Sequence, residues 1–153
     1  MKRIGIFLAL LLQAGHGLLA QEYQVADLAE AFSQGVIVIE ANRHACHRFD
    51  VFIAETNAQK QRGLMFVRKL PPQTGMLFIY RDANIHSMWM KNTYIPLDML
   101  FIRGDGRVSS VARNTEPLSL RSVGSTEPVN FVLELNAGET ERLFIDAGSL
   151  LVF

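Results

Sequence analysis

The 153-residue sequence has one cysteine, Cys46, and no excess of charge of either sign. A single cysteine excludes an internal disulfide, so the folded chain must be held by the packing of its core. The 15 basic residues balance the 15 acidic ones, which argues against a nucleic-acid-binding protein with a broad basic field. The length allows one domain. A composition of 49% hydrophobic and 20% charged residues indicates a globular chain.

Several motifs that carry known chemistry are also absent. The chain has no Gly-x-Ser-x-Gly elbow, no His-Glu-x-x-His metal motif and no phosphate-binding loop. The cluster around Cys46, with His44 and His47, lacks the first cysteine of a haem-attachment motif. It also lacks the second ligand pair of a structural zinc site. We therefore expect no cofactor, and we favour a non-enzymatic protein.

The first twenty residues have the order of a secretory signal peptide. Two basic residues come first, residues 4–12 are apolar apart from one glycine, and small residues follow. A membrane anchor would need ~20 apolar residues, whereas Gln13 interrupts this run early. We predict a signal peptide over residues 1–20, cleaved after Ala20 or Gly17. The mature protein would then be periplasmic or extracellular, with no stable membrane span.

The rest of the chain predicts a mostly β domain behind a short helix. Helical spacing of apolar residues predicts a helical lead segment over residues 21–35, ended by Gly35. Residues 36–153 alternate β-prone runs with turns, which predicts a single domain, mainly β with one or two short helices. The expected architecture is a small barrel-like or rolled antiparallel sheet. Strands are expected at residues 36–40, 49–54, 76–80, 85–91, 97–102, 108–113, 130–135 and 148–153, and helical turns at residues 59–65 and 139–144.

Five short motifs follow one another between residues 61 and 138. They are Gln61-Arg62-Gly63-Leu64-Met65, Gly75-Met76-Leu77-Phe78, Trp89-Met90-Lys91-Asn92-Thr93, Ile95-Pro96-Leu97-Asp98 and Val132-Leu133-Glu134-Leu135 with Ala137-Gly138. Their order and spacing resemble the domain-of-unknown-function 192 family (DUF192, also uncharacterised protein family 0127) over about residues 49–153. The resemblance implies a compact, barrel-like, often exported protein and no established activity. The chain departs from the family at Gly148-Ser149, where relatives often have Gly-Asp.

Residues 86–93 bring soft metal ligands close together. Read as a strand, they place His86, Met88 and Met90 on one face. Methionine sulfurs beside a histidine in an oxidising compartment favour a copper(I) site. However, residues four apart on a strand are ~13 Å apart, so His86 and Met90 could share an ion only across a bulge. We expect no metal, because methionines in a β core usually fill gaps in the packing.

Polar side chains gather around the same segment. Asn92 and Thr93 precede a proline turn, where they can either fix the backbone or contact a ligand. Asp98 and Glu134 each lie between apolar neighbours in a predicted strand, so each must face water or find a partner. Arg62 and Lys91 are the candidate partners, and an arginine–carboxylate network of this kind can line a pocket for a polar or anionic ligand.

We therefore predict an exported binding or accessory protein with a pocket around the Trp-Met-Lys-Asn-Thr and Pro-Leu-Asp motifs. Its partner would be an unknown small molecule or envelope component, and not nucleic acid. The alternatives are a hydrolase or lyase that uses Asp98 and Glu134 as an acid/base pair, if the carboxyls lie ~5 to 9.5 Å apart, and a copper(I)-handling protein. The expected ligand-binding residues are Arg62, Trp89, Lys91, Asn92, Thr93, Asp98 and Glu134.

Overall fold

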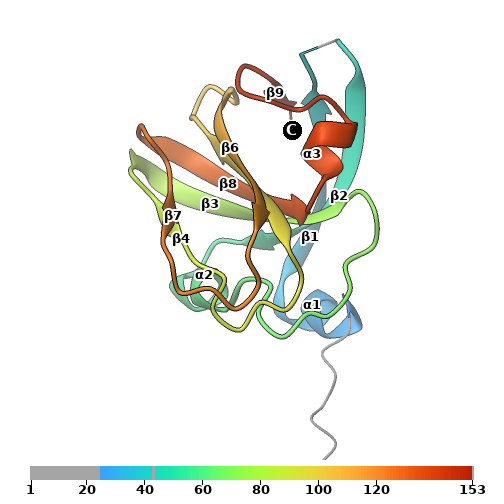
Figure 1. Ribbon diagram of the computed structural model, residues 1–153, viewed down its shortest axis with the longest axis vertical. Coiled ribbons are helices and arrows are strands. Elements are labelled where there is room, and N and C mark those ends of the chain that lie inside the picture. The colour runs from blue at the N-terminus through green and yellow to red at the C-terminus, as the bar shows by residue number, and fades with distance from the viewer. Residues whose placement is uncertain (1–24, 43, 153) are drawn as a thin grey trace, which may run out of the picture.

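The computed structural model describes residues 25–42 and 44–152 (Figure 1). The predicted signal peptide and the start of the helical lead segment lie outside the described residues. Among the described residues, no helix combines the length and the hydropathy that a membrane crossing requires. The elements of this part of the chain are α1 (Val25–Ala31), β1 (Ser33–Glu40), β2 (Cys46–Ala54), α2 (Asn57–Arg62), β3 (Thr74–Asn84), β4 (Ser87–Met88), β5 (Leu97–Ile102), β6 (Val108–Thr115), β7 (Val123–Gly124), β8 (Val129–Asn136), α3 (Glu139–Arg142) and β9 (Leu150–Val152).

Seven strands form one curled sheet in the order β6-β5-β8-β3-β2-β1-β9 (Figure 1). The two ends of this order meet, because Arg107 and Leu150 form an antiparallel bridge. Next to that bridge, the amide of Val108 donates to the carbonyl of Ser149 at 2.8 Å. The predicted single-domain, mostly β and barrel-like fold is thereby confirmed. Figure 1 shows α3 at one end of the curled sheet and α1 and α2 at the other.

The expectation of a purely antiparallel sheet is wrong at one place. Strands β2 and β3 are parallel, with a register that runs from Asp50 opposite Thr74 to Ala54 opposite Phe78. Parallel neighbours need a long crossover between them. Residues 55–73, which include α2, form that crossover. The sequence predicts a helix in this segment, but its local pattern does not distinguish a crossover from a hairpin.

Two element boundaries also differ from the prediction. The α1 helix ends at Ala31 and β1 begins at Ser33, so Gly35 lies inside a strand opposite Val51. Pairing with β2 thus overrides the helical spacing of this segment. The predicted strand at residues 85–91 is reduced to the two residues of β4, which pair with Val123 and Gly124 of β7.

Each face of the sheet has its own apolar core. The α2-side core holds residues such as Phe78, Met99 and Val132, and residues after α2 cover it. The α3-side core holds residues such as Leu100 and Leu133, together with Leu143 at the end of α3 and nearby Ile145. Because side chains alternate along a strand, successive residues of β5 and β8 enter different cores. This alternation determines where the two acidic residues of these strands lie.

Candidate functional site

A cavity of about 20 Å³ lies on the α2-side face of the sheet, and we call it the Glu134 cavity. A volume of this size holds about one water-sized group. It brings together five of the predicted ligand-binding residues, namely Arg62, Trp89, Lys91, Thr93 and Glu134. Its other lining residues are Lys60, Gln61, Gly63, Leu64, Met65, Phe78 and Met88.

A larger open cleft adjoins the Glu134 cavity. It has a volume of about 400 Å³ and we call it the Trp89 cleft. Lys60, Gln61, Met88 and Trp89 line both hollows, so the two lie side by side. The remaining lining residues of the cleft are Asn57, Tyr80 and Ser87. Lys60 and Tyr80 were not predicted as site residues, because neither belongs to a motif that marks a site.

Local sequence determines where α2 presents its basic residues. Thr56 Oγ1 accepts from the amide of Gln59 at 3.2 Å, and Gln59 Oε1 accepts from the amide of Thr56 at 3.0 Å, which forms a capping box. The helix stops at Gly63, whose φ is 47°. A Cβ there would lie 3.2 Å from Phe78 Cζ, so glycine suits both the backbone turn and the tight contact. Arg62 is the last residue of α2, and its guanidinium lies 5.3 Å from the Phe32 ring centroid.

Two lysines lie over aromatic rings that line the hollows. Lys60 Nζ is 4.6 Å from the centroid of the Tyr80 ring, and Lys91 Nζ is 5.1 Å from that of the Trp89 ring. Cation–π attraction holds ammonium groups in such positions. The Trp89 side chain is 49% exposed. The cleft therefore combines positive charge with flat apolar surface.

Asn92 and Thr93 fix the backbone beneath these residues. Asn92 has left-handed backbone geometry, and its carbonyl accepts from the amide of Phe66 at 2.8 Å. The amide of Thr93 donates to the carbonyl of Met90 at 3.0 Å. Of the two side chains, Thr93 Oγ1 donates to the backbone carbonyl of Lys91 at 3.4 Å, whereas Asn92 Nδ2 donates to Met65 Sδ at 3.8 Å. Thr93 also lines the Glu134 cavity, whereas Asn92 is not among its lining residues.

Glu134 lies in the central part of the sheet with little access to solvent. Its residue is 4% exposed, and its strand neighbours are Met76 on β3 and Met99 on β5. No described residue forms a hydrogen bond or an ion pair with its carboxyl group. Burial raises the pKa of Glu134 to about 8. At neutral pH the group is therefore mainly a protonated, uncharged acid.

Asp98 is completely buried on the opposite face, outside the Glu134 cavity. Its carboxylate accepts from the amides of Asn114 (3.0 Å), Gly138 (3.0 Å) and Thr140 (3.1 Å) and from Thr140 Oγ1 (2.7 Å). Two of these amides belong to the start of α3, so Asp98 caps that helix from a neighbouring strand. This saturated arrangement corrects the prediction that Asp98 lines the ligand pocket.

The predicted acid/base pair is not formed. Asp98 is opposite Leu135 and Met99 is opposite Glu134 in the β5–β8 ladder. Because consecutive strand positions point to opposite faces, the sheet itself separates the Asp98 and Glu134 carboxyls. The proposal that they act together as a hydrolase or lyase pair loses its geometric basis.

Of the copper candidates, Met88 and His86 both contact Tyr80, whereas Met90 contacts Thr115. Met90 Sδ accepts a hydrogen bond from Thr115 Oγ1 at 3.2 Å, and Met88 Sδ accepts one from the Tyr80 hydroxyl at 3.8 Å. The His86 ring stacks on Tyr80 with 3.5 Å between centroids. Within residues 25–42 and 44–152, no group of three or more His, Cys, Asp or Glu residues is placed to hold a metal ion. The methionines fill the α2-side core, as the alternative interpretation expected.

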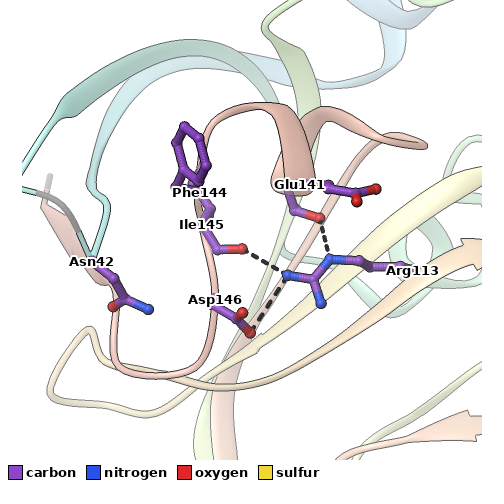
Figure 2. A pocket seen from close by; sticks show the side chains of 7 residues that line it. Asn42, Arg113, Glu141, Phe144, Ile145 and Asp146 are labelled. Carbon is purple, nitrogen blue, oxygen red and sulfur yellow. Dashed lines mark hydrogen bonds and ion pairs between the residues drawn. The ribbon is translucent and has the colours of Figure 1, made fainter.

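A hollow of about 480 Å³ beside α3 was not anticipated from the sequence (Figure 2). Arg113 is its central cation. Arg113 Nε donates to Thr140 Oγ1 at 3.1 Å, and Nη2 donates to the carbonyl of Ile145 at 3.0 Å and pairs with Asp146 at 3.4 Å. Through these contacts the guanidinium links β6 to α3 and to the residues that follow it. Five of its seven lining residues lie within residues 140–146, and Asn42 and Arg113 join them from distant segments of the chain.

Comparisons with known proteins agree with the fold. The family model of DUF192, described as Uncharacterized ACR, matches residues 37–153. A provisionally assigned transcription regulator from Sinorhizobium meliloti 1021 is 39% identical, with a TM-score of 0.78, over 79% of this chain and 94% of that chain. A protein of unknown function from Novosphingobium aromaticivorans DSM 12444 is 32% identical, with a TM-score of 0.76, over 78% and 85%. The search of curated proteins finds no match.

Proposed function

This chain belongs to the DUF192 family, and from that premise we propose that it is an exported binding protein for a small anionic molecule. The molecule would lie in the Trp89 cleft and reach the Glu134 cavity. One observation carries the proposal: Lys60, Arg62 and Lys91 converge with the half-exposed Trp89 on adjoining hollows.

The charge of the site favours an anion. Lysine and arginine side chains are cations at neutral pH, and three of them line the Glu134 cavity. The carboxyl in the same lining belongs to Glu134, which burial keeps largely protonated, with its pKa raised to about 8. The hollow therefore has a net positive charge, which attracts and orients a carboxylate or phosphate group.

The size and surface of the cleft favour a small molecule with an apolar part. A volume of about 400 Å³ is within the range of small-molecule sites. The half-exposed Trp89 offers apolar ring surface for a ring or a sugar. Asn57 and Ser87 add neutral polar groups at the wall.

A thermal-shift screen of the full chain tests this function. The compounds are small carboxylates, sugar phosphates and acidic cell-wall fragments, since a ligand of the native state raises its melting temperature. We expect at least one anion to raise the melting temperature of the wild type. That shift should disappear in Trp89→Ala and shrink in Lys91→Gln.

The matched control is Val36→Ala, which removes a similarly exposed apolar side chain from β1, away from the site. It should keep the full ligand-induced shift. A screen in which no anion acts, or one in which Trp89→Ala responds like the wild type, would contradict the proposed function.

Export is a separate part of the proposal and rests on residues 1–20. Cell fractionation of the native host, followed by N-terminal sequencing of the purified chain, tests it. We expect mature chains that begin at residue 21 or 18, outside the cytoplasm. An intact chain that begins at Met1 and stays in the cytoplasm would overturn export and leave the binding site unaffected.

The regulator assignment of the Sinorhizobium relative is not carried over to this chain. The 15 basic and 15 acidic residues of the present chain leave no net positive charge to attract the phosphate backbone of DNA. An acid/base enzyme is also not favoured, because Asp98 and Glu134 lie on opposite faces of the sheet.

A further inference from the structure

Five large apolar side chains lie near the surface around the turn that follows β4. They are between 37% and 69% exposed, and we call them the Tyr94 patch: Phe66, Trp89, Tyr94, Leu118 and Leu120. Exposed apolar residues that are scattered singly are ordinary, whereas a contiguous group of them marks a surface that binds something. The five residues come from three loop segments, so their contiguity depends on the contacts between those segments.

Backbone hydrogen bonds join the three segments. The amide of Phe66 donates to the carbonyl of Asn92 at 2.8 Å, and the amide of Leu118 donates to the carbonyl of Thr93 at 3.0 Å. The turn after β4 is therefore held from one side by the loop after α2 and from the other by the loop after β6. Figure 1 shows the loops that follow β4 and β6 at the end of the sheet away from α3.

The side chains of the patch also meet one another. The rings of Phe66 and Tyr94 pack edge to face, with 6.3 Å between their centroids. Trp89 and Leu120 line one open hollow of about 290 Å³, which is separate from the Trp89 cleft. The patch is therefore one continuous apolar surface that crosses all three segments.

Two residues of the patch have a backbone geometry that bulky side chains rarely adopt. The φ angle is 70° at Phe66 and 62° at Leu118, in the left-handed region where the Cβ is crowded. Both side chains remain about half exposed, so burial in the core does not explain this strain. Strained residues of this kind cluster at functional sites.

The loops of the patch carry positive charge and no negative charge. Residues 63–73, 85–97 and 117–126 contain no aspartate or glutamate. They contain four exposed basic residues, Arg68, Lys69, Lys91 and Arg121. The Arg68 guanidinium lies 4.7 Å from the centroid of the Tyr94 ring. Because the whole chain has equal numbers of acidic and basic residues, this separation of charge is a local property of the patch.

We infer that the Tyr94 patch docks on the surface of an anionic lipid bilayer, a function beyond ligand binding in the Trp89 cleft. Its aromatic and leucine side chains enter the boundary between headgroups and acyl chains, where tryptophan and tyrosine are favoured. Its four basic residues lie against the lipid phosphates, and each strengthens binding about fivefold near an anionic surface. Such docking is peripheral and requires no membrane-spanning segment.

A second copy of the chain fits this surface less well. In a two-fold symmetric dimer the same patch lies on both sides of the interface. The four basic residues of one copy would then face the four of the other, and like charges across an interface oppose association. An anionic bilayer supplies the opposite charge together with an apolar interior.

The fluorescence of Trp89 on the full chain tests the inference. Trp89 is the only tryptophan of the chain, so its emission reports on the patch and not on residues 1–20. The probes are vesicles of phosphatidylcholine alone and vesicles of phosphatidylcholine and phosphatidylglycerol in equal parts. We expect the anionic vesicles to shift the emission to shorter wavelength, and lipids brominated on their acyl chains to quench it. High salt should weaken the binding.

Substitutions identify the surface that inserts. The double variant Phe66→Asn with Leu118→Asn removes two apolar side chains, and asparagine tolerates a positive φ. It should bind anionic vesicles at least ~10-fold more weakly, and urea unfolding confirms that it is folded. The matched control is Phe144→Asn, which removes a half-exposed ring at a φ of 56° beside α3 and should leave binding unchanged. Arg121→Gln should weaken binding about fivefold, and Arg107→Gln, an exposed residue before β6, should not.

The remaining outcomes overturn the inference. No emission shift with anionic vesicles would leave the patch to a protein partner. A shift that survives in the double variant would place the membrane contact elsewhere in the chain. Wild-type dimers that the double substitution disperses, without any response to lipid, would assign the patch to a second copy. Displacement of the vesicles by soluble glycerol phosphate would reduce the interaction to binding of a headgroup in the Trp89 cleft. None of these results depends on the thermal-shift screen, so the two proposals fail separately.

Discussion

Asp98 and Glu134 are buried carboxyls on neighbouring strands, and they have opposite surroundings. Asp98 accepts hydrogen bonds from three amides and one hydroxyl. Glu134 accepts none from any described residue. Yet the sequence around each is similar, an acid between apolar residues in a strand. The contrast shows that the role of a buried acid is determined by the layer that covers its face of the sheet.

The covering layers explain the difference. On the α3 side, the amides of Gly138 and Thr140 at the start of α3 donate hydrogen bonds to the Asp98 carboxylate. On the α2 side, methionines and a small cavity face Glu134. Asp98 is thus part of the framework, whereas Glu134 is an acceptor with room beside it.

Removal of Asp98 should have the largest effect on stability. Asp98→Ala removes the acceptor of the amides of Asn114, Gly138 and Thr140, of which Thr140 is buried, so we expect a loss of about 3–5 kcal/mol in the free energy of unfolding. Urea denaturation followed by circular dichroism measures it. Asp82→Ala, at an exposed position, should change stability by less than ~0.5 kcal/mol. A small loss in Asp98→Ala would mean that other groups hold α3.

Glu134→Gln should increase the free energy of unfolding, and the size of the increase should depend on pH. The native state keeps the proton of Glu134 up to about pH 8, against 4.5 for an ordinary glutamate. Between these two pH values Glu134 keeps its proton in the native state and loses it in the unfolded state. The contribution of Glu134 to wild-type stability therefore falls as the pH rises from 4.5 to 8. The glutamine of the variant does not titrate, so this contribution is absent from its stability. We expect it to match the wild type near pH 4.5 and to be about 2–4 kcal/mol more stable at pH 8.5.

The difference between the two proteins, measured by urea unfolding at each pH, isolates Glu134 from other titrating groups. A difference that stays constant with pH would show that Glu134 is already paired in the native protein. The contrast with Asp98 would then disappear.

Thr140→Val should have the smallest effect of the three. Thr140 Oγ1 donates to Asp98 at 2.7 Å and accepts from Arg113 Nε at 3.1 Å. Valine keeps the shape and removes both bonds, at an expected loss of about 1–2 kcal/mol. Thermal unfolding measures the loss against Thr126→Val, an exposed threonine for which we expect no change. Equal melting temperatures would place the stabilisation of Asp98 in the backbone amides alone.

Local sequence patterns predicted the positions of the strands well, but they predicted which strands pair, and in which direction, less well. The expected strand at residues 97–102 coincides with β5, because its residues are β-prone and turns bound it on both sides. The parallel pairing of β2 with β3 depends on where α2 packs, which strand propensity does not encode. The same limit applies to the acid/base pair, since the sequence does not reveal which of two strand faces each acid occupies before the register is known.

The candidate site could be predicted in part for a physical reason. Glu134 stood out because a charge between apolar neighbours needs a partner, and Arg62 and Lys91 stood out as the candidate partners. Lys60 and Tyr80 did not, because a lysine on a helix and a tyrosine in a strand are ordinary there. The partners of Asp98 were also out of reach, since Gly138 and Thr140 follow it by 40 and 42 residues.

The bridge between Arg107 and Leu150 joins strand β9 to the residue that precedes β6. Strand β9 pairs with β1 on one side, and the residues around it bond to the start of β6 on the other. Unpaired strand edges are templates on which other chains can assemble. Without these residues the edges of β1 and of the start of β6 would both be unpaired, so we expect such a chain to associate with other chains more readily.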